Sequence, residues 1–109
     1  YNLFLGSTDE LVSLQKPVDI IFALVLGKEV TEQRFLGRFV ELSTSSAVVE
    51  SDHFVEPWSN LQIALKNHPD AEDLYAKALS TKSGRFLIRF TLVSPRVEEL
   101  LFTWVQGNR

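Results

Sequence analysis

The apolar residues of this 109-residue chain follow two different periods, and the change between them falls at Ser94. Before Ser94, short stretches rich in β-branched and aromatic residues alternate with turn signals. In residues 61–65, for example, Leu, Ile and Leu occupy every second position. A period of two is typical of half-buried strands, whereas a period near 3.6 is typical of an amphipathic helix. The chain is therefore predicted to fold as a mainly β domain that ends in one helix.

Six segments before Ser94 are predicted to be strands, separated by turn signals such as the serine-rich run 43–46 and the glycine-containing turn at 82–84. These strands are residues 18–26, 34–42, 47–50, 61–65, 74–81 and 85–92. Closely spaced strands of this kind predict a small six-stranded antiparallel barrel. Residues 1–14 show little periodicity and are predicted to be a linker or a short N-terminal helix, which leaves 15–109 as the barrel domain.

The final segment has the start and stop signals of a helix. Ser94 can serve as the N-cap, Pro95 suits the first helical position, and Gly107 suits the end. Apolar residues recur between them at i, i+3, i+4, i+7 and i+8, namely Val97, Leu100, Leu101, Trp104 and Val105. This stripe predicts a C-terminal α-helix packed on the barrel.

Composition excludes several classes of protein. The chain has 11 basic and 14 acidic residues, and a net charge of -3 disfavours binding to a nucleic acid polymer. The absence of cysteine excludes disulfides and thiolate metal sites, and it fits a cytoplasmic protein. The longest apolar run, 18–26, is too short for a membrane span. Because the chain begins with tyrosine and has no methionine, we expect it to be part of a longer protein.

Charge is distributed unevenly along the chain. Residues 1–54 carry four basic and eight acidic residues, a balance of -4, whereas residues 55–109 carry seven and six, a balance of +1. Residues 74–97 contain five cationic side chains and no acid. An anion-attracting surface can therefore form locally in spite of the net charge.

Motifs for catalysis are missing, so the chain is predicted not to be an enzyme. It has no phosphate-binding glycine loop, no nucleophile elbow and no zinc-binding helix motif. His53 and His68 lie in turn-like segments without metal-ligand spacing and are interpreted as surface residues. The carboxylates of Asp70, Glu72 and Asp73 resemble an acid pair only superficially, because acids in polar connections usually face solvent or cap a turn.

Two pairs of residues allow a functional interpretation beside a structural one. Arg85 and Arg89 are four apart on a predicted strand and point the same way, so they can clamp a phosphate or, alternatively, pair with carboxylates on neighbouring strands. Phe54 and Trp58 lie near a turn, where they can form a partner-binding spot or plug the end of the barrel.

Residues 37–50, read GRFVELSTSSAVVE, are followed by Pro57 and the strand 61–65, and this order resembles the PilZ domain family. The strand 85–90 and the helix that starts after Ser94 also resemble the way in which PilZ domains end. The resemblance covers about residues 15–106. It implies a six-stranded barrel with a C-terminal helix and a role as a bacterial receptor for cyclic di-GMP.

The family's ligand motifs are RxxxR ahead of the first strand and (D/N)xSxxG after the second. The second motif is matched at Ser43, but Glu41 replaces the aspartate and Ser46 replaces the glycine. Residues 11–17, where the first motif should fall, contain no arginine, and Lys16 is their one cation. Arginine binds phosphate or guanine in a bidentate manner, and glycine lets the backbone come close to a ligand.

These departures predict weak or no binding of cyclic di-GMP. If each bidentate arginine contact supplies ~1–3 kcal/mol, the loss of two weakens binding by roughly 30-fold to 20,000-fold. We therefore expect a degenerate PilZ-like signalling module, without a cofactor, that contacts a protein partner or a neighbouring domain. The alternative is a receptor that binds cyclic di-GMP through non-standard contacts of the cations and hydroxyls at Lys16, Ser43, Ser46, Arg85 and Arg89.

Overall fold

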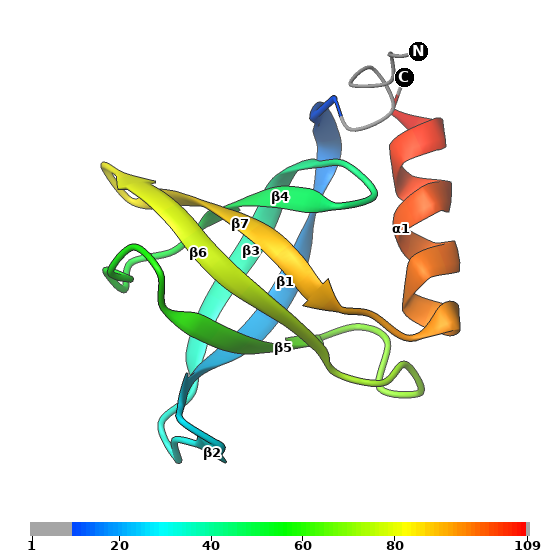
Figure 1. Cartoon of the computed structure of the whole chain (residues 1–109). Helices are drawn as coiled ribbons and strands as arrows, with labels where there is room; N and C mark the ends of the chain where they lie inside the picture. The colour runs from blue at the N-terminus through cyan, green and yellow to red at the C-terminus, as the bar shows by residue number, and fades with distance from the viewer. Residues whose placement is uncertain (1–9, 109) are drawn as a thin grey trace, which may run out of the picture.

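A computed structural model describes residues 10–108 of the chain (Figure 1). Seven strands precede one helix, which begins where the apolar period changes. The elements are β1 (Val12–Leu26), β2 (Glu29–Val30), β3 (Phe35–Leu42), β4 (Ser46–Glu50), β5 (Asn60–Leu65), β6 (Leu74–Lys82), β7 (Arg85–Leu92) and α1 (Pro95–Gly107).

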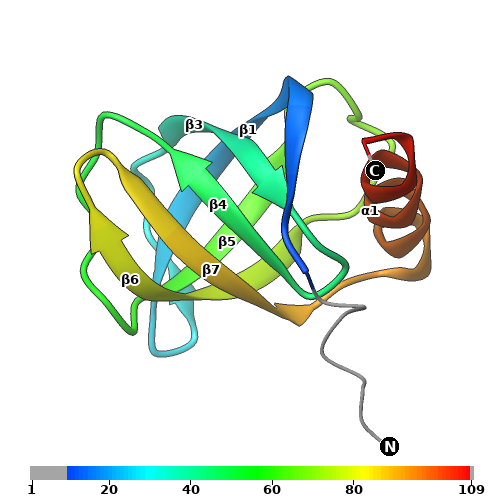
Figure 2. The same ribbon diagram turned by 90° about the horizontal axis from the view of Figure 1, so that it is seen from above.

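Six of these strands form a closed antiparallel barrel. Neighbouring strands follow the order β1, β3, β4, β7, β6 and β5, and β5 pairs with β1 to close the sheet (Figure 2). The two-residue strand β2 pairs only with the end of β1. This architecture confirms the predicted six-stranded barrel.

The inside of the barrel is filled by alternating side chains of the strands. In β5 every second residue is buried, as its sequence pattern predicts. Around one end, the ring of Phe22 lies 5.5 Å from that of Phe35 and 5.7 Å from that of Phe86. His53 stacks on Phe35 with ring centroids 3.6 Å apart. These rings, rather than Phe54 or Trp58, fill that end of the core.

Helix α1 begins and packs as predicted. The Ser94 hydroxyl accepts a hydrogen bond from the Val97 backbone N–H at 3.3 Å, and Pro95 follows the cap. Three residues of the predicted stripe are buried and two are partly buried against the core. In Figure 2 the helix lies to one side of the barrel. Among residues 10–108 there is no helix of the length and apolarity that a membrane span requires.

The N-terminal boundary differs from the prediction. Strand β1 begins at Val12, so residues 12–14 belong to the barrel rather than to a linker or helix, and residues 1–9 lie outside the described part. Pro17, the residue before the predicted strand 18–26, cannot donate a ladder hydrogen bond. The structure accommodates it where the pairing of β1 with β3 is interrupted, between Ser13 and Val18.

The hairpin between β6 and β7 follows the glycine signal. Ser83 and Gly84 both have positive φ, 45° and 81°. Two such residues form the tight turn whose twist suits an antiparallel hairpin. The turn brings the cationic residues of two neighbouring strands onto one outer surface.

Candidate functional site

The predicted ligand residues Glu41, Ser43 and Ser46 lie at the end of β3, in the β3–β4 turn and at the start of β4. Ser43 is fully buried, and its hydroxyl oxygen accepts hydrogen bonds from the backbone N–H groups of Ser46 at 2.9 Å and Ser45 at 3.2 Å. A serine that closes a turn in this way is occupied by its own backbone. Glu41 and Ser46 are partly exposed.

The first part of β1 runs beside this turn. Val12 pairs with Leu42 and Ser13 with Glu41. The backbone N–H of Gln15 donates to the Asn108 side-chain oxygen at 2.9 Å, which ties this part of β1 to the end of α1. Lys16 is exposed at the interruption in the strand pairing. The structure therefore brings Val12 and Ser13 next to the end of β3 beside the turn, whereas Lys16 lines a pocket with Trp104 and Asn108 at the end of α1.

Arg89 lies close to the same turn. It is directly opposite Ser46 in the pairing of β4 with β7, and the backbone N–H of Phe90 donates to the Ser45 carbonyl at 2.9 Å. On its other side Arg89 faces Lys77 of β6, which in turn faces Asn60 of β5. We call Ser46, Arg89, Lys77 and Asn60 the cationic row.

Arg85 belongs to a different line of residues across the barrel. Its Nη2 lies 3.1 Å from Glu50 Oε2, and Arg38 donates from Nε to Glu50 Oε1 at 2.8 Å. Register places Asp19 opposite Arg38 and Lys82 opposite Arg85. We call Asp19, Arg38, Glu50, Arg85 and Lys82 the charge ladder. Arg85 thus has the carboxylate partner that the structural interpretation expected.

The ladder perturbs the ionisation of its members. The hydrogen bond from Arg38, helped by the charges of both arginines, holds the pKa of Glu50 below its ordinary value. The same hydrogen bond raises the pKa of Arg38. Glu50 is therefore an ionised structural partner at neutral pH rather than a proton donor or acceptor.

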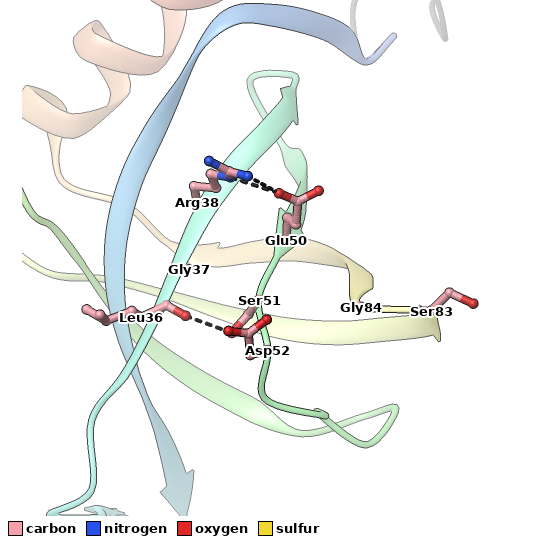
Figure 3. Close-up of a pocket in the computed structure, with 8 residues that line it drawn as sticks. All are labelled: Leu36, Gly37, Arg38, Glu50, Ser51, Asp52, Ser83 and Gly84. Atoms are coloured by element: carbon pink, nitrogen blue, oxygen red, sulfur yellow. Dashed lines mark hydrogen bonds and ion pairs between the residues drawn. The ribbon is translucent and has the colours of Figure 1, made fainter.

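An open groove lies between the ends of β3 and β4 and the β6–β7 turn, with a volume of about 340 Å³ (Figure 3). Arg38 and Glu50 point toward each other across it, and the Ser51 hydroxyl donates to the Leu36 carbonyl at 2.7 Å. A Cβ on Gly37 would lie 3.2 Å from the Glu50 carbonyl oxygen, so β3 approaches β4 closely here. The polar groups in this groove are largely paired with one another.

The remaining candidate residues are dispersed. Phe54 and Trp58 are 64% and 68% exposed, so neither plugs the barrel. His53 and His68 are partly buried against aromatic rings rather than free on the surface. Within residues 10–108, no three histidine or acidic side chains are placed to hold a metal ion. Asp70 lies 3.7 Å from Arg96, in an exposed ion pair.

The structure thus divides the predicted ligand residues into two groups. Four of them lie at or beside the β3–β4 turn, namely Glu41, Ser43, Ser46 and Arg89. The other two lie elsewhere: Arg85 is four residues away along β7 and is held by Glu50, and Lys16 lies beside the end of α1. Sequence reasoning did not identify the Arg38–Glu50 pair. Counting outward from the serine turn would place Ser51 opposite Arg38, because the register of β3 and β4 shifts by one residue between Phe39 and Glu41.

Comparisons with known proteins identify the fold. No protein-family model and no curated protein matches the sequence. Among solved structures, the chain is similar to the crystal structure of the PilZ domain of CeSA from a cellulose-synthesizing bacterium. The TM-score is 0.59 at 17% sequence identity, and the match covers 90% of this chain and 96% of that one. The barrel with its C-terminal helix therefore has the fold of a PilZ domain.

Proposed function

We propose that this chain is a non-catalytic, cytoplasmic signalling module of a larger bacterial protein that binds cyclic di-GMP weakly or not at all and acts by contacting a protein partner or a neighbouring domain. The PilZ fold supports a binding module in general. The finer proposal depends on the residues around the β3–β4 turn.

One observation carries it: the segment beside the turn lacks the arginine pair. Val12 and Ser13 of β1 pair with the end of β3 beside the turn, and Lys16 is the one cation of residues 12–16. Lysine offers a point charge, whereas arginine offers a planar fork that matches phosphate and guanine edges. The Ser43 hydroxyl is buried and hydrogen bonded to its own turn, so it has little hydrogen-bonding capacity left for a ligand.

Ser46 supports the same conclusion. It replaces the motif glycine, its backbone has no positive φ, and its N–H is occupied by the Ser43 hydroxyl. A side chain at this position keeps a ligand farther from the backbone than glycine would. No residue at the turn itself therefore replaces the two missing bidentate contacts, whose loss is expected to weaken binding roughly 30-fold to 20,000-fold.

Calorimetric titration with cyclic di-GMP tests this proposal. We expect no saturable heat in the micromolar range. A Kd near micromolar would contradict the proposal. A variant with V12R, K16R, E41D and S46G restores the motif letters beside the turn and provides the comparison, because it should bind more tightly than the natural sequence.

A second candidate, a receptor with non-standard contacts, is favoured by the position of Arg89. Its guanidinium is exposed beside Ser46, at the edge of the turn where the family's second motif falls. If the chain binds cyclic di-GMP in this way, Lys16→Ala and Arg89→Ala should each weaken binding. Unchanged affinity in both variants would remove the support for this candidate.

A further inference from the structure

Two cations face each other on the outer surface of the barrel. Lys77 of β6 and Arg89 of β7 are directly opposite in the strand register, with Asn60 and Ser46 on the outer sides of the pair. Neither side chain makes an ion pair or hydrogen bond with any residue in the range 10–108. Like charges in this position repel across the strands, so the pair is a cost to the isolated fold.

No neighbour along the cationic row compensates for this charge. The row contains no carboxylate, and residues 74–97, which include both strands, contain no acid. The charge ladder on the same strands places Glu50 between two arginines. The chain as a whole has a net charge of -3, so attraction of an anion to this surface depends on the local pair and not on the overall charge.

Trp58 lies beside the same row. Its backbone N–H donates to the carbonyl of Ala78, the residue after Lys77, at 2.7 Å. Its φ is 72°, an uncommon conformation for a residue other than glycine, and its side chain is 68% exposed. Tryptophan and arginine are enriched in protein-binding hot spots, and Arg89 lies on β7, the strand next to β6.

We propose that the cationic row and Trp58 bind an acidic, extended segment of a protein partner. The row crosses β4, β7, β6 and β5, which at ~4.8 Å between strands is a span of about 14 Å. An extended peptide covers that distance with about four residues, so the carboxylates of alternate residues can meet Arg89 and Lys77 while an apolar part lies against Trp58. This inference rests on the proposed protein-binding function and specifies the chemistry of the partner.

Binding of a fluorescein-labelled oligoglutamate peptide, followed by fluorescence anisotropy at low ionic strength, tests the proposal. The variant K77Q/R89Q should bind about tenfold more weakly than the natural sequence, which two exposed charge contacts can supply. The matched control K28Q/K66Q removes the same charge from two exposed lysines away from the row and should bind like the natural sequence. Trp58→Ala should weaken binding of an oligoglutamate peptide that carries one leucine, without changing the net charge.

The proposal is overturned if the peptide shows no saturable binding, or if K77Q/R89Q and K28Q/K66Q lose affinity equally. Cyclic di-GMP, titrated in parallel, separates this result from the proposed function. Micromolar nucleotide binding together with peptide binding at the row refutes only the proposed weak binding of cyclic di-GMP. Absence of both kinds of binding refutes the acidic partner alone.

Discussion

The charge ladder and the cationic row both cross β4, β7 and β6 but differ in how their charges are balanced. In the ladder, Glu50 lies between Arg38 and Arg85 and is hydrogen bonded to both. In the row, Arg89 lies between Ser46 and Lys77 and has no acidic neighbour in the strand register. The arginines of the ladder have a carboxylate partner within the fold, whereas the cationic row contains no carboxylate.

The difference shows that the role of an arginine on an exposed strand depends on the residues opposite it in the neighbouring strands. Arg85 and Arg89 share a strand, a face and similar exposure, and the sequence places them in one candidate clamp. Only the partner strand distinguishes them, because β4 supplies a carboxylate at one position and a serine at the other. The following experiments alter one line while leaving the other unchanged.

The largest effect is expected from Ser43→Ala, which disturbs the end of the cationic row without changing its charge. The buried hydroxyl satisfies the N–H groups of Ser45 and Ser46, and a buried N–H without a partner costs ~1–3 kcal/mol. Urea unfolding should show a loss of stability of about this size. Thr44→Ala, in the same turn, is the control, and an equal loss in both variants would contradict the role assigned to Ser43.

Glu50→Gln should have the next largest effect on stability, because it disrupts the charge ladder and leaves the cationic row unchanged. It removes the carboxylate between Arg38 and Arg85 and leaves these two cations on either side of a neutral residue. We expect a fall in Tm of a few degrees at neutral pH, reduced by added salt because screening weakens the new repulsion. An unchanged Tm at low ionic strength would show that the ladder adds nothing to stability.

The lowered pKa of Glu50 predicts that the stability of the fold depends on pH. Because the pKa of Glu50 is lowered in the folded protein, ionised Glu50 stabilises the fold above its ordinary pKa, near 4.5. This contribution is lost as pH falls through the folded-state pKa. The stability difference between the natural sequence and Glu50→Gln should therefore be present at pH values above 4.5 and decline below it. A difference that is constant across this range would contradict the assignment.

Lys77→Glu should produce a smaller change of opposite sign. It converts the like-charged pair of the cationic row into an opposite-charged pair and so makes the row resemble the ladder. Cross-strand pairs of this kind contribute ~0.2–1 kcal/mol, so the variant should be slightly more stable. Thermal unfolding measures the change, with Lys28→Glu as the control variant. A lower Tm for Lys77→Glu than for the natural sequence would show that Lys77 and Arg89 do not repel each other.

Much of the fold could be predicted from the sequence, because alternation and turn residues are local signals. The six barrel strands and helix α1 follow from them, whereas the start of β1 was missed because Pro17 marked a false boundary. The pairing of Lys77 with Arg89 could not be predicted. Counting from the Ser83–Gly84 turn would place Ala78 opposite Arg89, and an irregularity between Ala78 and Ser80 shifts the register by one residue.

Chemical-shift mapping of the ¹⁵N-labelled chain with an oligoglutamate peptide tests most directly the claim that the two lines differ in function. The amide signals of Lys77, Ala78, Arg89 and Phe90 should shift in a saturable manner, while those of Arg38 and Glu50 remain in place. Shifts centred on the charge ladder, or shifts of equal size on both lines, would contradict the account.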